Sequence, residues 1–233
     1  MKQFKNPFAD LTLFERSLWG VSVAVIVLSA VLMGGADVLS VIASLIGVTA
    51  LIFVAKGYVI GQILTVVFAV FYGIISFGQR YYGEMITYLG MSSPMAIAAA
   101  VAWLKNPFRD TKEVAVRPMT AAAVVWLILS TVLVTAAFYF ILGAMSNASL
   151  VFSTVSVTTS FLASALTYLR SPYYALAYAA NDIVLIVLWI IAMRGDTSYL
   201  SMVLCFVMFL SNDLYGFFNW RRMEKTQKMT ADK

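Results

Sequence analysis

The chain has 233 residues, of which 62% are hydrophobic and 12% are charged, and its formal net charge is +5. A water-soluble domain is usually about half apolar and about a quarter charged, so this composition excludes a soluble globular fold. The sequence contains no histidine, which is the most common metal ligand and general base at neutral pH, and its single cysteine, Cys205, excludes an intramolecular disulfide. We expect no cofactor and no bound metal. The basic residues lie at the ends of apolar runs, which indicates membrane topology rather than nucleic-acid binding.

Eight apolar runs are long enough to cross a bilayer, which takes roughly twenty predominantly apolar residues. In chain order they cover 18–34, 38–55, 58–78, 85–104, 119–144, 150–169, 173–193 and 199–220. Turn or charged residues divide them at 34–37, 56–57, 78–80, 146–147, 170–172 and 194–196. The first run is interpreted as a retained helix and not a signal peptide, because Asp10 and Glu15 lie among the basic residues of its flank. The sequence therefore predicts an all-α polytopic membrane protein with about eight transmembrane helices.

The basic residues divide unevenly between the two faces of the membrane. With eight spans, both termini and every second loop share one face, and that face holds all 16 basic residues except Arg80 and Arg194. Cytoplasmic loops carry the excess of Lys and Arg in membrane proteins. We therefore predict that both termini are cytoplasmic.

Two stretches of the chain resemble each other, one from Lys56 to Trp103 and the other from Arg170 to Trp220. In each, a basic residue ends one span, two further spans follow, and a Trp with a basic neighbour ends the last. By their loop charges both units begin on the outer face, which predicts parallel three-helix repeats joined by a linker helix, as in SWEET transporters. An ancient duplication without a transport role is the alternative. The predicted segments are 1–37 (tail and extra helix), 38–105 (first repeat), 106–149 (basic loop and linker helix), 150–222 (second repeat) and 223–233 (tail).

Polar side chains inside the spans are costly in hydrocarbon and tend to mark a pathway or a binding site. Gln62 and Tyr72 share one face of the third span. The sixth span is rich in small hydroxyl residues, which are typical of helix packing, and Thr159 near its middle is a candidate contact. These side chains are predicted to line a site, with helix packing as the alternative interpretation.

Two Asn-Asp pairs give the strongest indication of a site. Asn181 and Asp182 lie half way along the seventh span, with Trp189 on the face of Asp182, and Asn212 and Asp213 lie in the eighth span. Amides and carboxylates suit ribose hydroxyls and carboxamides, and aromatic faces suit flat cationic rings. No Arg or Lys lies in mid-span, which disfavours a phosphorylated substrate. The predicted substrate-binding residues are Gln62, Tyr72, Thr159, Asn181, Asp182, Trp189, Asn212 and Tyr215.

At these residues the chain resembles the nicotinamide riboside transporters of the Pnu family of vitamin transporters. The resemblance is carried by 55–62 (AKGYVIGQ), 81–95, 160–189 and 212–220 (NDLYGFFNW), and it covers about residues 38–223. It implies a SWEET-like core of three, one and three helices, a homotrimer in a bacterial inner membrane, and uptake of nicotinamide riboside by facilitated diffusion. It also implies that a cytosolic riboside kinase makes the flux one-way by phosphorylating the substrate, without needing to contact the transporter.

The chain departs from the family pattern at several aromatic and polar positions. Many members have Trp residues early in the seventh span and a Gln after the Pro-Met pair of the fourth, where this chain has Tyr173, Tyr178 and Ala96. Relatives with altered aromatics carry thiamine, riboflavin or deoxynucleosides, so these substrates are alternatives. An intramembrane enzyme with Asp182 and Asp213 as a catalytic dyad is the alternative from another class. Neither residue lies in a recognisable protease sequence, so we expect that the chain is not an enzyme.

Overall fold

The computed structural model describes residues 6–33, 38–78, 82–145, 149–194 and 200–231. In these ranges the regular structure is helical, and eight helical segments are long and apolar enough to cross a membrane, which confirms the predicted fold class. The dividers expected at 34–37 and 146–147, and most of those at 78–80 and 194–196, lie outside the described residues. The elements are a short 3-10 helix η2 (Pro7–Asp10), α1 (Leu13–Met33), α2 (Val38–Ala55), α3 (Val59–Gly78), α4 (Tyr82–Ile86), the π-helical segment η3 (Thr87–Ser92), α5 (Ser93–Lys105), α6 (Ala121–Ala144), α7 (Leu150–Tyr168), α8 (Tyr174–Met193) and α9 (Leu200–Ala231).

Two helices are longer than the apolar pattern predicted. The first begins at Leu13 because Thr12 and Glu15 form a capping box, in which each side chain accepts a hydrogen bond from the backbone N–H of the other. The last continues to Ala231, beyond the apolar residues. Ion pairs from Glu224 to Arg221 (2.7 Å) and to Lys228 (2.9 Å), at helical spacing, stabilise this polar extension.

The fourth span is divided where the sequence predicted one continuous helix. Pro94 has no backbone N–H, and its ring crowds the carbonyl of Gly90 one turn earlier. The chain accommodates this with the π-helical segment η3 between α4 and α5. Short π-helical insertions of this kind are often found at functional sites.

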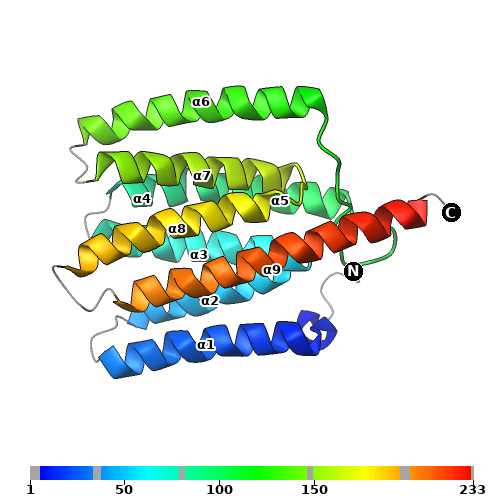
Figure 1. Ribbon diagram of the computed structural model, residues 1–233, viewed down its shortest axis with the longest axis horizontal. Helices are drawn as coiled ribbons and strands as arrows, with labels where there is room; N and C mark the ends of the chain where they lie inside the picture. Colours follow the sequence, from blue (N-terminus) through cyan, green and yellow to red (C-terminus); the bar gives the residue numbers. More distant parts are fainter. Residues whose placement is uncertain (1–5, 34–37, 79–81, 146–148, 195–199, 232–233) are drawn as a thin grey trace.

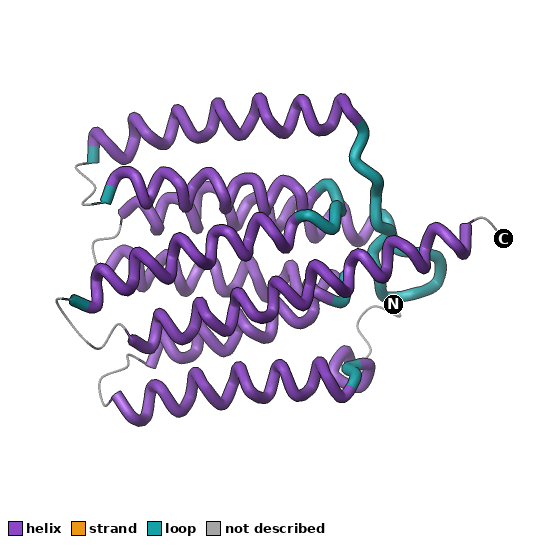
Figure 2. The backbone as a smooth tube through the Cα atoms, viewed as in Figure 1, coloured by secondary structure: helices purple, strands orange, loops and turns teal. Residues whose placement is uncertain are grey.

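The helices run side by side along a common direction, with α1 and α6 on opposite outer sides of the bundle (Figures 1 and 2). The start of α1 and the end of α9 lie at the same end of the bundle. We call it the basic end because basic residues of the loops and helix ends gather there: Lys56, Lys105, Arg109, Lys112, Arg117, Arg170, Arg221 and Arg222. In the α6 segment the only buried side chain is Leu142, so most of this helix faces outward.

The turn between α2 and α3 has the same backbone structure as the turn between α7 and α8. Gly57 and Arg170 both have positive φ, at 69° and 60°. The N–H of Gly57 donates to the carbonyl of Val54 (2.9 Å), and the N–H of Arg170 donates to the carbonyl of Thr167 (3.0 Å). Glycine adopts this conformation without steric cost, whereas arginine does so only when its surroundings hold it.

The loop before α6 joins the two turns. The N–H of Val114 donates to the carbonyl of Gly57 (3.0 Å), and the N–H of Arg117 donates to the carbonyl of Arg170 (3.1 Å). Gln227 of the α9 extension accepts from the N–H of Val116 (2.8 Å) and donates to the carbonyl of Val114 (3.1 Å). Hydrogen bonds at the basic end therefore connect segments that are far apart in the sequence.

Two tryptophans form matching bonds between the halves of the bundle. Trp103 of α5 donates to the carbonyl of Thr167 in α7 (3.0 Å), and Trp220 of α9 donates to the carbonyl of Val54 in α2 (2.9 Å). Their rings are 5.3 Å apart and fully buried. The helices pack in the same pattern, since α2 contacts α3 and α9 while α7 contacts α8 and α5.

Candidate functional site

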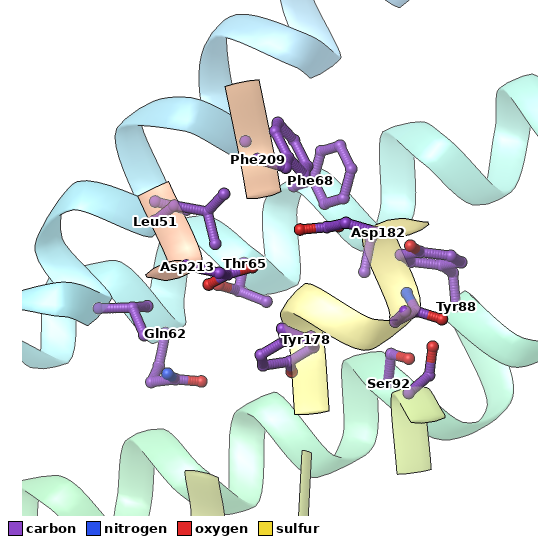
Figure 3. Close-up of a pocket in the computed structure, with 16 residues that line it drawn as sticks. Leu51, Gln62, Thr65, Phe68, Tyr88, Ser92, Tyr178, Asp182, Phe209 and Asp213 are labelled. Atoms are coloured by element: carbon purple, nitrogen blue, oxygen red, sulfur yellow. The ribbon is translucent and has the colours of Figure 1, made fainter. Parts of the chain in front are cut away.

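A cavity of about 60 Å³ lies inside the bundle, and Figure 3 shows the side chains around it. Its lining comes from α2, α3, η3, α7, α8 and α9, and α1 and α6 contribute no residue to it. Some of the buried polar residues that the sequence singled out lie in its wall, and their role in binding stays a prediction. The polar lining residues are Gln62, Thr65, Tyr88, Ser92, Ser160, Tyr178, Asn181, Asp182 and Asp213.

Asp182 of α8 and Asp213 of α9 form a carboxyl pair in the wall of this cavity. Each residue is 3% exposed, and the two side chains are hydrogen-bonded to each other. Two carboxyl groups can form such a bond only when at least one of them holds a proton, so the pair carries at most one negative charge. Asp182 Oδ2 is buried without a hydrogen-bond partner. An unsatisfied buried acceptor is costly, and a bound donor would relieve that cost.

Asn181 is held in place by α7. Its Oδ1 accepts hydrogen bonds from Ser156 Oγ (3.2 Å) and from Thr159 Oγ1 (2.9 Å). This leaves its Nδ2 group without a partner among the described residues. Gln62 of α3 is 3% exposed and its amide likewise has no hydrogen bond within the described part of the chain. The cavity wall thus presents amide donors and a carboxylate acceptor to a ligand, and Thr159 acts by positioning Asn181.

Layers of aromatic side chains close the cavity in both directions along the bundle. Toward the basic end, the ring of Trp220 is 5.3 Å from Trp103 and 4.9 Å from Tyr174. Toward the opposite end, the ring of Tyr72 is 4.4 Å from Tyr88 and 6.1 Å from Phe206. All of these rings are buried. The cavity therefore lies between two layers of buried aromatic side chains.

Five of the eight predicted binding residues, Thr159 among them, do not line the cavity. Tyr72 lies in the aromatic layer next to it, and Trp189 is buried in the apolar core toward the end opposite the basic end. Asn212 donates to Ser22 Oγ of α1 (3.0 Å), and the hydroxyl of Tyr215 donates to Glu15 Oε1 (2.7 Å). Their roles as substrate contacts stay predictions, whereas Gln62, Asn181 and Asp182 are on the cavity wall and Thr159 is one bond behind it.

Sequence reasoning missed several aromatic residues of the wall. Phe68 of α3, Tyr88 of η3 and Phe209 of α9 all line the cavity. An aromatic residue within an apolar span does not stand out by composition, so only its position relative to Gln62 or Asp213 could have indicated a role. The ring of Phe68 is 5.4 Å from that of Phe209 and 6.0 Å from that of Tyr88.

An eight-span helical bundle with an internal cavity that has polar groups in its wall is the architecture of a polytopic membrane transporter. Residues 37–222 match the model of the family described as the nicotinamide mononucleotide transporter family. The chain belongs to this family, and it is a membrane transporter rather than an enzyme.

Two curated relatives agree with this assignment, and one solved structure shares the fold. The chain is 26% identical over 193 residues to the nicotinamide riboside transporter PnuC of Neisseria mucosa, covering 80% of this chain and 73% of that protein. It is 25% identical over 189 residues to the nicotinamide riboside transporter PnuC of Haemophilus influenzae, covering 80% of each. The crystal structure of the vitamin B3 transporter PnuC has the same fold, with a TM-score of 0.83, 24% identity, and coverage of 94% of this chain and 95% of that one.

Proposed function

We propose that this transporter carries nicotinamide riboside into a bacterial cell across the inner membrane by facilitated diffusion. The observation that carries the proposal is the central cavity, whose wall combines the Asp182–Asp213 pair with the amides of Asn181 and Gln62. Two relatives of the chain are named nicotinamide riboside transporters. The ribose hydroxyls and the carboxamide of this substrate match the donors and acceptors of the wall.

The charge of the wall supports a riboside and not its phosphorylated form, although the family description names the mononucleotide. The cavity lining contains no Lys or Arg among the described residues, and phosphate groups are usually bound by such side chains. At a separation of roughly 5 Å and an effective dielectric constant of about 20, two unit charges interact by about 3 kcal/mol. A phosphate beside an ionised Asp182–Asp213 pair would be repelled by an energy of that order.

The same charge favours a cationic ring. The pyridinium of nicotinamide riboside would be attracted by the Asp pair and by the faces of Phe68 and Tyr88. Thiamine also contains a cationic ring, so it is the strongest alternative substrate. Riboflavin and deoxynucleosides are uncharged and gain nothing from the pair.

We propose that the chain is organised as the three-helix repeats 38–105 and 150–222, an extra helix within 1–37, a linker segment 106–149 and a tail 223–233. The matching turns at Gly57 and Arg170 and the matching Trp103 and Trp220 bonds support this division. The six helical elements that line the cavity belong to the two repeats, as in a SWEET-like core. Ligand pockets usually measure roughly 300–1,000 Å³, so the repeats must move apart to admit a nucleoside.

The surface of the protein supports a proposal for its orientation in the membrane and its oligomeric state. The concentration of Lys and Arg at the basic end supports cytoplasmic termini. The outward-facing apolar side chains of α6 suit a helix against lipid or a neighbouring protomer, which supports the proposed homotrimer. A cytosolic riboside kinase would then trap the product without contacting the transporter.

Binding to the purified protein tests the substrate directly. Calorimetric titration with nicotinamide riboside should give saturable binding, thiamine should compete more strongly than riboflavin or thymidine, and nicotinamide mononucleotide should compete weakly. In proteoliposomes the riboside should equilibrate without ATP or an ion gradient. Tight binding of the mononucleotide would contradict the riboside assignment, and concentrative uptake in that system would contradict facilitated diffusion.

A further inference from the structure

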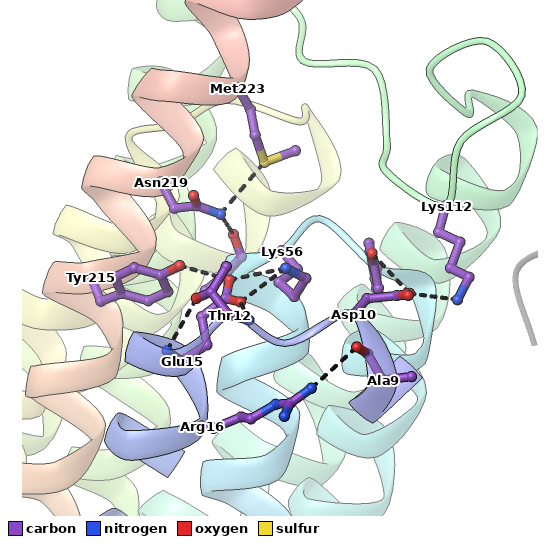
Figure 4. A network of polar contacts seen from close by, with 12 residues as sticks. Ala9, Asp10, Thr12, Glu15, Arg16, Lys56, Lys112, Tyr215, Asn219 and Met223 are labelled. Carbon is purple, nitrogen blue, oxygen red and sulfur yellow. Dashed lines mark hydrogen bonds and ion pairs between the residues drawn. The ribbon is translucent and has the colours of Figure 1, made fainter. Parts of the chain in front are cut away.

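A second cavity, of about 530 Å³, lies at the basic end between α1 and α9, and we call it the side cleft. It shares no residue with the central cavity. Figure 4 shows the polar groups at its base, where the start of α1 meets Lys56 and one face of α9. Its lining comprises Thr12, Phe14, Glu15, Lys56, Glu113, Tyr215, Phe218, Asn219, Arg222, Met223 and Thr226.

Three of the polar lining groups satisfy one another. Glu15 Oε1 and Oε2 each accept from Lys56 Nζ at 3.0 Å, and Oε1 also accepts from the hydroxyl of Tyr215 at 2.7 Å. The opposite charges of Glu15 and Lys56 cancel. Two further ionisable groups line the side cleft, the carboxylate of Glu113 and the guanidinium of Arg222, and neither is hydrogen-bonded through its side chain within the described residues.

Glu113 and Arg222 have opposite charges, and they differ in how far their side chains are buried. Glu113 lies on the loop before α6, whose backbone bonds to the α2–α3 turn, and burial raises the pKa of its carboxyl group. Arg222 projects from the side of α9 and is exposed. A half-buried carboxylate is stabilised by a cationic partner, so the side cleft offers one place for a cation and one for an anion.

Apolar rings flank the side cleft on its bilayer side. Phe218 precedes Arg222 by four residues, so it occupies the same face of α9 about 6 Å deeper along the helix. Phe14 lies against Tyr215, with ring centroids 5.2 Å apart. Phe218 is 68% exposed and Phe14 is 63% exposed. Charged groups at the level where helices leave the membrane, with exposed aromatic rings one turn deeper, match the polarity profile of a phospholipid.

We propose that the side cleft binds a zwitterionic phospholipid with a primary amine, phosphatidylethanolamine, with its phosphate on Arg222 and its ammonium group near Glu113. The acyl chains then lie along Phe14 and Phe218. The opposite charges of Arg222 and Glu113 complement this headgroup, whereas a purely anionic headgroup would add no cation beside Glu113, whose carboxylate lies near Lys56 without a hydrogen bond to it. This proposal does not depend on which substrate the central cavity carries.

Lipid retention by the full-length protein, measured by native mass spectrometry, tests the proposal. The protein is delipidated in detergent and titrated with dioleoyl-phosphatidylethanolamine, dioleoyl-phosphatidylglycerol or dioleoyl-phosphatidylcholine. We expect one phosphatidylethanolamine per protomer, retained about tenfold better than the other two lipids. Arg222→Ala and Glu113→Gln should each lower retention about tenfold. Arg221→Ala is the matched control, because Arg221 is paired with Glu224 and does not line the side cleft.

The other outcomes would overturn the proposal in recognisable ways. Equal losses in Arg222→Ala and Arg221→Ala would indicate nonspecific attraction of lipid to a basic surface. Stronger retention of phosphatidylglycerol would replace the zwitterionic site with an anionic one. Displacement of the lipid by inorganic phosphate at millimolar concentration would indicate a phosphate site. If no lipid is retained and the variant Phe218→Cys forms crosslinks between copies, this face is a contact between protomers.

Discussion

Substitutions in the Asp182–Asp213 pair can distinguish the contribution of its charge to substrate binding from the contribution of its hydrogen bonds. Because the two side chains are bonded to each other, they share at least one proton and carry at most one negative charge. Replacing either residue alone with Asn supplies an amide N–H in place of the shared proton. The remaining carboxylate keeps the charge, and the hydrogen bond between the side chains is kept as well.

The two single variants should therefore bind a cationic substrate almost as well as the wild type, within about threefold. In the double variant Asp182→Asn with Asp213→Asn, neither side chain carries a negative charge. At roughly 5 Å and an effective dielectric constant of about 20, the lost attraction is about 3 kcal/mol. Since each 1.4 kcal/mol corresponds to a tenfold change, affinity should fall roughly a hundredfold.

Calorimetric titration of the three variants with nicotinamide riboside measures this difference, and thermal unfolding shows whether each variant is folded. The uncharged dihydropyridine form of the riboside is the matched ligand control, and its affinity should change much less in the double variant. If each single variant lost as much affinity as the double variant, the two carboxyl groups would act as separate contacts. The shared charge would then not be the recognition element.

Three other predictions concern the cavity wall, the tryptophan pair and the basic end. Asn181→Ala should weaken riboside binding about tenfold in the same titration, because it removes one buried amide contact, and unchanged affinity in folded protein would move the site away from α8. Trp103→Phe and Trp220→Phe should each lower the free energy of unfolding by about 1 kcal/mol, since each loses one hydrogen bond to a backbone carbonyl; strongly unequal losses in denaturant titrations would contradict the equivalence of the two bonds. The hydrogen bond from Lys112 holds the pKa of Asp10 below its ordinary value, so this interaction is complete at neutral pH and is lost only as pH falls below about 4. Asp10→Asn should remove that part of the acid destabilisation, and identical pH profiles of the melting temperature would show that the contact contributes nothing.

The spans were predictable because burial in lipid demands long apolar segments, and this demand is visible in the sequence alone. The positions of helix ends were less predictable where polar interactions extend a helix. Thr12 and Glu15 move the start of α1 forward, and Glu224 stabilises an extension of α9 that has no apolar pattern. Pro94 gave a local reason to expect a break in the fourth span, but it does not specify that the break is π-helical.

The site was predictable only in part, because residue type indicates depth in the membrane but not direction within the bundle. Asn181 and Asn212 belong to similar Asn-Asp pairs, yet Asn181 lines the cavity and Asn212 bonds to Ser22 of α1. The helical period places Asn212 and Tyr215 on one stripe, which faces α1 rather than the cavity. The sequence analysis placed the first helix outside the two repeats. It therefore did not anticipate that residues of this helix would accept hydrogen bonds from Asn212 and Tyr215.

The matching turns allow the two halves of the bundle to be compared residue by residue. If Gly57 corresponds to Arg170 and Val54 to Thr167, the same register places Phe68 opposite Asn181 and Ala69 opposite Asp182. All four residues line the cavity, so the symmetry of the backbone extends into the site. The chemistry does not follow that symmetry, because one half supplies an aromatic face where the other supplies an amide and a carboxyl group.

This division suits a substrate that is itself asymmetric, with a flat ring at one end and a hydroxylated sugar at the other. A symmetric polar site would offer the ring no aromatic face, and a symmetric aromatic site would leave the sugar hydroxyls unsatisfied. Moving the carboxyl group between the halves, by Asp182→Ala combined with Ala69→Asp, should therefore weaken binding more than Asp182→Asn does, even though the cavity keeps its composition. Retained binding in that folded variant, measured by the same titration, would show that the ligand recognises the net charge of the cavity and not the arrangement of its two halves.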